Sequence, residues 1–261
     1  MDFRKTFDTI PEEFDKWRPR YCPELFERVI SYSQLGPGRS ALEIGPGTGQ
    51  ATEPILKTGC DYLAIELGEH FCDFMNKHFG AYDNFHIVNA DFETYDFGKR
   101  KFDLVYSAAT IQWIPEQIAF SRTYELLKSG GVLAMFMTRT DYRTPNPALY
   151  DAIQRVYDAH FHVDEHYTCH LDYERAVNYG FEDFHYTEWK QRCVYTAQQY
   201  VEYLAATQIE HITLKEPYRS RYFSGIEQAV RDAGGSITLD NTIALYLTRK
   251  PASAQKQALH R

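Results

Sequence analysis

The residues with the clearest chemical potential lie together at positions 43–49, where one acidic residue precedes three glycines. Glu43 is followed by Gly45, Gly47 and Gly49, so glycine occupies every second position of a short segment. Glycine tolerates positive φ angles and lets the backbone approach a ligand closely. A carboxylate beside such a turn repels phosphate and attracts an amine or a sulfonium. The spacing and the charge therefore predict a site for a positively charged ligand.

The spacing of these glycines also argues against two phosphate-binding motifs. A dinucleotide fingerprint places its third glycine five residues after the first. Here Gly49 comes four residues after Gly45, and Gln50 occupies the next position. A phosphate loop needs a lysine and then a serine or threonine after its last glycine, and no such string follows. A NAD-dependent oxidoreductase, the competing interpretation of this turn, is therefore disfavoured.

A second group of reactive side chains lies further along the chain, where four histidines occur among acidic residues and a cysteine. Its members are His160, His162, Asp164, Glu165, His166, Cys169 and His170. The last three histidines are four residues apart, a spacing that would place them on one face of a helix. Such a face could bind a metal, contact a substrate or act as a base, or it could only pack or face solvent. We expect no metal site.

The glycine turn must be positioned by the elements around it, which alternate between strand and helix patterns. We predict strands over 40–44, 61–66, 85–88, 102–107 and 131–138, and helices over 9–17, 50–58, 69–79 and 115–128. A further helix is expected from Pro23, because proline suits the first position of a helix. This alternation is typical of a parallel sheet with helices on both faces. The turn then lies at the carboxyl edge of the first strand, where such sheets bind ligands.

In the order of its motifs the chain resembles the class I S-adenosylmethionine (SAM)-dependent methyltransferases. The resemblance rests on five ordered matches between residues 40 and 138. These are E-I-G-P-G-T-G-Q at 43–50, Ile65-Glu66-Leu67, Ala90-Asp91-Phe92, residues 102–109 and residues 126–133. Together with residues 14–21, they make the chain look closest to small-molecule methyltransferases of the trans-aconitate type. The family implies a Rossmann-like, doubly wound α/β fold with a seven-stranded, mostly parallel sheet, an antiparallel last strand and a helical cap insertion.

The regular alternation stops at about residue 141, and the chain is expected to form three parts. Residues 147–180, 197–209 and 217–233 are predicted to be helical, and residues 183–195 and 238–248 to be strands. We assign residues 1–140 to a SAM-binding core with an N-terminal lid segment. Residues 141–235 are assigned to a mainly helical cap that includes the sixth strand, and residues 236–250 to the last strand of the core sheet. The cap is expected to cover the active site.

The resemblance also implies which residues hold SAM. Glu66 would accept the ribose hydroxyls, and Asp91 with Phe92 would bind adenine. Glu43 would meet the methionine amino group, and the planar guanidinium of Arg18 would pair with the methionine carboxylate. The full expected set is Trp17, Arg18, Glu43, Gly45, Gly47, Gly49, Glu66, Leu67, Asp91, Phe92, Ser107, Ala108 and Gln112. The plainer alternatives are a solvated Glu66, a turn aspartate beside a core phenylalanine, a buried Glu43 held by backbone donors and a surface salt bridge at Arg18.

The catalytic residue is less clear from the sequence. Methyl transfer from a sulfonium is an in-line displacement, so the enzyme chiefly aligns the nucleophile, the methyl carbon and the sulfur. A general base is needed only where the nucleophile must lose a proton. Many relatives carry histidine before the tryptophan that follows the fourth strand, but here Gln112 precedes Trp113. Either no base is used, or the inserted region supplies one, with His166 and His170 as candidates.

Composition limits the possible partners of this 261-residue chain. Its formal net charge is −8, and an acidic balance disfavours a non-specific grip on nucleic acid or on an anionic membrane. The Asn/Asp-Pro-Pro-aromatic string of nucleic-acid amino-methylating relatives is absent. The twenty tyrosines and seventeen phenylalanines suit an aromatic cavity or packing within the cap. The five cysteines include no C-x-x-C pair, so neither a zinc knuckle nor a disulfide framework is indicated.

These observations predict a SAM-dependent enzyme that methylates oxygen or nitrogen of a small-molecule acceptor, with no nucleic-acid or membrane partner. The alternative is a SAM-binding sensor or scaffold of the same fold without turnover. No apolar leader and no run of membrane-spanning length occurs, so a cytoplasmic location is expected. The oligomeric state is expected to be a monomer or a homodimer.

Overall fold

The computed structural model describes residues 3–164, 166 and 168–252, whose seven strands form one sheet. The strands are β1 (Ser40–Ile44), β2 (Asp61–Glu66), β3 (Ile87–Asn89), β4 (Phe102–Ala108), β5 (Leu127–Asp141), β6 (Glu182–Thr196) and β7 (Ser236–Arg249). Their order across the sheet is β3-β2-β1-β4-β5-β7-β6. Strands β1 to β5 pair in parallel, whereas β7 runs antiparallel to both of its neighbours. The predicted Rossmann-like α/β fold is confirmed.

The order in which successive strands are added to the sheet reverses between β3 and β4. Strands β1, β2 and β3 extend the sheet to one side, and β4 then returns to the other side of β1. In doubly wound sheets the crevice beyond the carboxyl ends of such neighbouring strands is where ligands bind. The glycine-rich turn follows β1 directly, so it lies at this switch point.

Helices cover both faces of the sheet and also gather at one end of it. The helices are α1 (Pro11–Trp17), α2 (Pro23–Ser33), α3 (Thr52–Leu56), α4 (Glu69–Phe79), α5 (Glu116–Leu126), α6 (Pro147–His160), α7 (Ala197–Thr207), α8 (Ile209–Thr213) and α9 (Tyr218–Asp232). Short 3-10 helices span Phe3–Lys5, Phe7–Thr9, Ile111–Trp113 and Tyr173–Tyr179. The predicted bounds of β1, β2 and α4 are confirmed.

The apolar residues of each strand alternate between the two faces and form two separate cores. In β1, Leu42 packs with residues of α5 on one face, and Ala41 packs with residues of α2, α3 and α4 on the other. Both residues are fully buried. A continuous apolar strand of this kind is typical of a parallel sheet covered on both faces.

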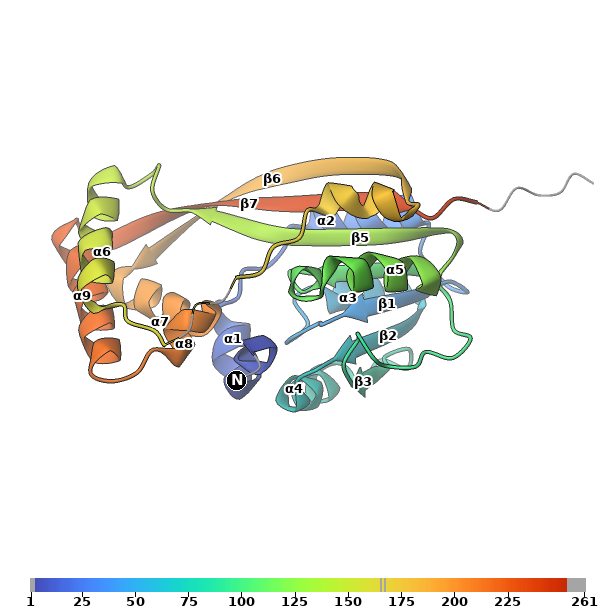
Figure 1. Ribbon diagram of the computed structural model, residues 1–261, viewed down its shortest axis with the longest axis horizontal. Coiled ribbons are helices and arrows are strands. Elements are labelled where there is room, and N and C mark those ends of the chain that lie inside the picture. Colours follow the sequence, from blue (N-terminus) through green and yellow to red (C-terminus); the bar gives the residue numbers. More distant parts are fainter. Residues whose placement is uncertain (1–2, 165, 167, 253–261) are drawn as a thin grey trace, which may run out of the picture.

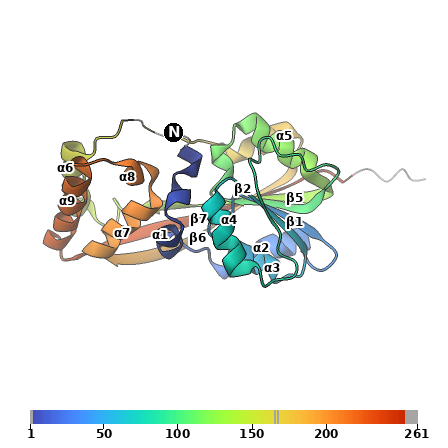
Figure 2. The ribbon, with the colours of Figure 1, turned by 90° about the horizontal axis from the view of Figure 1, so that it is seen from below.

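The last three strands are long, and their far ends carry the cap. Figure 1 shows α6, α7, α8 and α9 gathered at one end of β5, β6 and β7, with α1 between this group and the sheet. Figure 2 shows the same arrangement from below, where α1 lies between α7 and α4. The cap has its own apolar core, which includes Leu149, Tyr200, Ile226 and Leu239.

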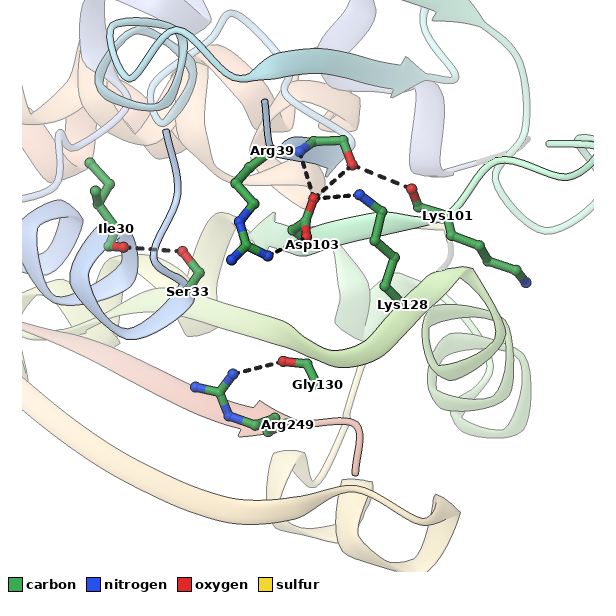
Figure 3. Close-up of polar contacts among 9 residues, drawn as sticks. Ile30, Ser33, Arg39, Lys101, Asp103, Lys128, Gly130 and Arg249 are labelled. Carbon is green, nitrogen blue, oxygen red and sulfur yellow. Dashed lines mark hydrogen bonds and ion pairs between the residues drawn. The ribbon is translucent and has the colours of Figure 1, made fainter. Parts of the chain in front are cut away.

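An ion-pair network fixes the opposite end of the sheet, where β1, β4 and β5 begin (Figure 3). Asp103 Oδ2 accepts hydrogen bonds from the Ser40 backbone nitrogen at 2.8 Å and from Lys128 Nζ at 2.6 Å. Asp103 Oδ1 accepts from Arg39 at 2.9 Å. Burial opposes ionisation of this carboxyl, but the hydrogen bonds from Lys128, Arg39 and Ser40 outweigh it and lower the pKa to about 2.

Two helices predicted in the cap are shorter than expected. The helix predicted over 147–180 ends at His160, residues 161–164 and 168–172 are irregular, and a 3-10 helix begins at Tyr173. Most of the described residues in this segment are exposed, so a helix there would bury little apolar surface. The helix predicted over 197–209 is interrupted at Gln208, whose extended backbone separates α7 from α8.

Candidate active site

The glycine-rich turn after β1 adopts the left-handed backbone that its composition predicts. The φ angles are +62° at Gly45, +58° at Gly47 and +88° at Gly49. A Cβ atom at Gly45 would lie 2.3 Å from Thr110 Cγ2, and one at Gly49 would lie 2.4 Å from Phe79 Cε2. Glycine is therefore required at both positions by backbone conformation and by space.

A cavity of about 380 Å³ opens beside this turn. Most of its wall comes from segments at the carboxyl ends of the strands, namely residues 45–47 after β1, 65–67 at the end of β2, 90–92 after β3, and 108–110 with 112–114 at and beyond the end of β4. The N-terminal segment and residues 207–211 of the cap also line it. The cavity thus joins the carboxyl edge of the sheet to the cap. Its size lies within the range of small-molecule sites.

Glu66 is the carboxylate at the end of β2, and it is buried in the cavity wall. Its Oε2 accepts a hydrogen bond from the Gly47 nitrogen at 3.0 Å, and its Oε1 accepts one from the Gly68 nitrogen at 2.8 Å. Burial raises its pKa to about 7 despite these backbone donors, and the negative charge of Asp8 raises it further. A carboxylate has about four acceptor sites, so two remain for ligand hydroxyls.

Asp91 and Phe92, which the resemblance assigns to adenine, line the cavity beyond β3. Asp91 Oδ1 accepts a hydrogen bond from the Glu93 nitrogen at 2.9 Å, and Oδ2 forms an ion pair with Arg4 at 3.1 Å. Arg4 also pairs with Glu93 at 2.7 Å and lines the same cavity. This N-terminal arginine carries no motif, so only the folded chain reveals that it closes this end of the site.

The N-terminal segment contributes Arg18 to the cavity but not Trp17. The Arg18 guanidinium lies 5.4 Å from the centre of the Phe14 ring. Within the described part of the chain it forms no ion pair, so its charge is available to a ligand carboxylate. Trp17 instead packs in the cap core, with its ring 6.1 Å from that of Tyr195.

Glu43 lies behind the glycine turn and does not line the cavity. It is fully buried, and its Oε2 accepts hydrogen bonds from Thr52 at 2.7 Å, from Tyr106 at 2.7 Å and from Tyr62. Its Oε1 is buried without a hydrogen-bond partner among the described residues. Burial raises the pKa of Glu43 above its ordinary value, although the three hydroxyl donors oppose this. Side-chain hydroxyls hold Glu43, not the backbone donors considered above.

Two further residues expected at the cofactor site also support the turn from outside the cavity. Gly49 packs against Phe79, as described above. Ser107 is buried, donates a hydrogen bond to the Ile44 carbonyl at 3.2 Å and accepts one from the Ile111 nitrogen at 2.9 Å. Ser107 therefore ties the end of β4 to the end of β1. The remaining expected residues Leu67, Ala108 and Gln112 line the cavity.

Gln112 has a fixed orientation in the cavity wall. Its Oε1 accepts a hydrogen bond from the Tyr173 hydroxyl at 3.1 Å, and its Nε2 donates one to the Ala109 carbonyl at 3.0 Å. One N–H of the amide remains for a ligand. The side chain can therefore donate to a ligand but cannot remove a proton from it.

His166 and His170, the candidate bases in the cap, do not line the cavity. Both are exposed on the irregular segment that follows α6, so the helix face that their spacing suggested does not form. His166 Nδ1 lies 3.0 Å from Glu210 Oε1. Glu165 lies outside the described residues. Across residues 3–164, 166 and 168–252, no group of three or more histidine, cysteine or acidic side chains is arranged to hold a metal ion.

The cap presents a different histidine to the cavity, His211 on α8. Its Nε2 lies 3.0 Å from the Tyr222 hydroxyl, and its ring packs against Phe161 with centroids 4.8 Å apart. Burial lowers its pKa to about 4, and the nearby charge of Arg219 acts in the same direction. No motif marks His211 in the sequence, and only the packing of α8 against α9 places it here.

Known proteins with sequences similar to this chain are methyltransferases. Residues 42–135 match a family described as "Methyltransferase domain". A ribosomal RNA small subunit methyltransferase A from Synechococcus sp. is 36% identical over 74 residues, covering 27% of this chain and 26% of that protein. A malonyl-[acyl-carrier protein] O-methyltransferase from Marinomonas sp. is 29% identical over 131 residues, covering 49% of this chain and 48% of that protein.

Solved structures share the fold at low sequence identity. A putative type II methyltransferase from Anaeromyxobacter dehalogenans superposes with a TM-score of 0.66 at 19% identity, covering 90% of this chain and 99% of that one. A phosphoethanolamine N-methyltransferase 2 from Haemonchus contortus, solved in complex with phosphomonomethylethanolamine and S-adenosylhomocysteine, gives 0.57 at 17% identity, covering 96% of this chain and 60% of that one.

These comparisons show that residues 42–135 match a methyltransferase domain and that the chain shares the fold of solved methyltransferases. The chain spans 26% and 48% of the lengths of the two relatives above. The family match at residues 42–135 covers the glycine turn and its neighbouring strands. No described helix is both long enough and apolar enough to cross a membrane.

Proposed function

We propose that this protein is a SAM-dependent methyltransferase that transfers a methyl group to oxygen or nitrogen of a small-molecule acceptor. One observation carries the proposal: a single cavity joins the glycine turn, Glu66 and the Asp91–Phe92 pair to the cap. The first three features suit the methyl donor, and the cap end leaves room for the acceptor.

The residues of the cavity fit each part of SAM. Glu66 keeps two acceptor sites for the two ribose hydroxyls, and Asp91 with Phe92 offers an acceptor and an apolar face for adenine. Arg18, which forms no ion pair among the described residues, suits the methionine carboxylate. When bound, SAM supplies an electrophilic methyl group on a good leaving group. The chain then contributes chiefly by alignment, which can supply up to about 7–11 kcal/mol in well-oriented systems.

Glu43 serves this site indirectly in our proposal. Its buried carboxylate ties Thr52, Tyr62 and Tyr106 together directly behind the turn. That network holds the turn in the left-handed conformation which lets its backbone approach the donor. Contact between Glu43 and the methionine amino group, expected from the family, would require a bridging water, since Glu43 does not line the cavity.

The small-molecule acceptor is supported by the cap and by one relative. We assign residues 1–140 to the core with its N-terminal lid, residues 141–235 to the cap and residues 236–250 to the closing strand. Residues 207–211 then close the cavity from the cap side. The malonyl-[acyl-carrier protein] O-methyltransferase match extends over 49% of the chain, nearly twice the 27% matched by the ribosomal RNA methyltransferase. The net charge of −8 also disfavours an RNA acceptor.

Calorimetric titration with S-adenosylhomocysteine tests the donor site. We expect one molecule bound per chain, no heat from NAD, and loss of binding in Gly47→Arg, because the new side chain would fill the turn. Absence of S-adenosylhomocysteine binding by the native protein would refute the proposal.

A second assay tests the acceptor class. Tritiated SAM is incubated with either a defined pool of small phenols, alcohols, amines and carboxylic acids or a transcript of small-subunit ribosomal RNA. We expect label in the small-molecule fraction only. Label in the RNA would support the competing acceptor that the ribosomal RNA methyltransferase match suggests. Binding without transfer to either would favour the sensor or scaffold alternative.

A further inference from the structure

The sheet ends at a long strand that is paired on one side only. β6 is the last strand in the order across the sheet, and β7 is its only paired neighbour among the described strands. Figure 1 shows β6 along the upper border of the sheet, with no described helix above it. An edge strand presents N–H and C=O groups that can pair with a further strand. With 15 residues, β6 offers a longer edge than most strands do.

This edge also carries exposed apolar side chains. Four large apolar side chains are exposed in the described chain, and two of them lie on β6, namely Tyr186 at 44% and Val194 at 61%. Both point to the same face of the strand as the exposed Glu188, Lys190 and Arg192, because side chains alternate between faces. β6 contains no proline that would block pairing. A long edge with exposed apolar groups is typical of a strand that associates with another chain.

The charges on β6 match a second copy of the same strand that runs antiparallel to it. A twofold axis between the two strands places one residue opposite itself, and this residue defines the register. Trp189 is the midpoint of β6, so an axis there pairs the two strands over their full length. The same register places Glu188 opposite Lys190 of the second copy, and symmetry repeats this pair on the other side of the axis. Opposite charges in directly opposed positions stabilise a strand pair.

A shift of the axis by one residue destroys this match. With the axis at position 188, the two copies of Glu188 oppose each other, and with the axis at position 190, the two copies of Lys190 do. Like charges directly opposite each other are destabilising, and larger shifts shorten the paired length. The charged residues that protect this edge from unspecific pairing therefore favour the register centred on Trp189.

The other opposed positions on the exposed face are compatible with the same register. Val194 comes opposite Phe184 of the second copy, so the pairing covers the most exposed apolar side chain of the strand. Tyr186 comes opposite Arg192, and an arginine guanidinium packs favourably on a tyrosine ring. On the opposite face the two copies of Trp189 meet at the axis, where aromatic cross-strand pairs are stabilising.

We propose that the protein forms a twofold-symmetric homodimer by antiparallel pairing of its β6 strands, with the axis at Trp189. The two seven-stranded sheets then join into one continuous sheet. Because the strands are antiparallel, the cap end of each β6 lies beside the core end of the other. No residue of β6 lines the cavity described above, so the inference does not depend on the methyltransferase function.

The test is a charge swap followed by sedimentation velocity from low to high micromolar concentration. We expect the native full-length chain to form a dimer as its concentration rises. Lys190→Glu or Glu188→Lys alone should raise the dimer dissociation constant about tenfold or more, because each creates two opposed like-charge pairs. The double variant Glu188→Lys/Lys190→Glu should restore native dimerisation. The matched control is Arg231→Glu, which reverses one member of an exposed ion pair on α9 and should leave the dimer unchanged.

Hydrogen exchange of the native protein, followed by mass spectrometry, locates the interface without any variant. Backbone amides of residues 184–194 should exchange more slowly at high than at low protein concentration. A native protein that stays monomeric at every concentration, leaving the edge to solvent or to a different chain, would overturn the proposal. A dimer that both single reversals leave intact, or one that leaves exchange in β6 unchanged, would overturn it as well.

Discussion

The raised pKa of Glu66 leads to a prediction about how donor binding depends on pH. In the proposed donor site the ribose hydroxyls of S-adenosylhomocysteine donate to this carboxylate, so the ligand binds the ionised form and competes with its proton. Burial raises the pKa of Glu66 to about 7 in the folded protein. S-adenosylhomocysteine affinity should therefore be full above pH 7 and should fall as the pH drops through 7.

The size of the effect follows from the ionised fraction. With a pKa of 7, Glu66 is about 90% ionised at pH 8 and about 9% ionised at pH 6. The dissociation constant should therefore rise about tenfold between these two values. Binding at pH 7 should release about half a proton, because about half of the Glu66 carboxyls are protonated before the ligand arrives.

Isothermal titration in two buffers of different ionisation enthalpy measures both quantities. Glu66→Gln is the informative variant, because it removes the titrating group and retains the size of the side chain. Its affinity at pH 8 should fall by about 1.5–3 kcal/mol, the value of a hydrogen bond to a charged group, and its pH dependence should disappear. Glu53→Gln, on the exposed side of α3, should behave as the native protein does. A pH-independent affinity in the native protein, or the same dependence in Glu66→Gln, would refute this role.

Three further predictions concern other parts of the molecule. Arg18→Ala should weaken S-adenosylhomocysteine binding about 10- to 100-fold but leave adenosine binding unchanged, since adenosine lacks the carboxylate; an equal loss for both ligands would contradict this. Gly49→Ala should lower the free energy of unfolding in urea by about 1–3 kcal/mol, because φ is +88° and the new Cβ would lie 2.4 Å from Phe79; unchanged stability would show that the turn relaxes. Asp103→Asn should cost about 1–3 kcal/mol in the same assay through its lost ion pairs with Arg39 and Lys128, with S-adenosylhomocysteine affinity unchanged because Asp103 lies at the far end of β4.

The core of the fold could be predicted from sequence because its signals are local. Each of β1 and β2 is a short apolar run beside a turn, and α4 has a regular apolar face, so their bounds match the structure. Glu66 and the Asp91–Phe92 pair could be located for the same reason, since parallel strands bring their carboxyl ends to one edge. Their positions in the chain therefore also fix their positions in the cavity.

The cap could not be predicted in the same way because its site residues depend on contacts between distant segments. His166 and His170 looked suitable by spacing, but the described residues around them are mostly exposed and form no helix. His211 has no distinctive sequence context and is placed by Tyr222 and Phe161. Arg4 reaches the end of the cavity that contains Asp91 only because the N-terminal segment folds back over it.

The sequence also cannot separate residues that border a cavity from those that support its wall. Glu43 and Ser107 belong to the motifs that resemble the family, but neither lines the cavity. Glu43 accepts hydrogen bonds from Thr52, Tyr62 and Tyr106. Ser107 donates one to the backbone of β1. Strand residues alternate between faces, and local pattern does not show which neighbouring hydroxyls will meet a buried carboxylate. Hydrogen-bond partners that lie far apart in the chain become visible only in the folded protein.

The most direct test of the methyltransferase proposal is a crystal structure of the protein with S-adenosylhomocysteine. We predict that the ribose hydroxyls contact Glu66, that adenine lies between Asp91 and Phe92, and that the homocysteine carboxylate meets Arg18. The sulfur should then face the cap end of the cavity, toward His211. Ligand bound elsewhere on the protein, or bound in this cavity with its ribose away from Glu66, would contradict the proposed function.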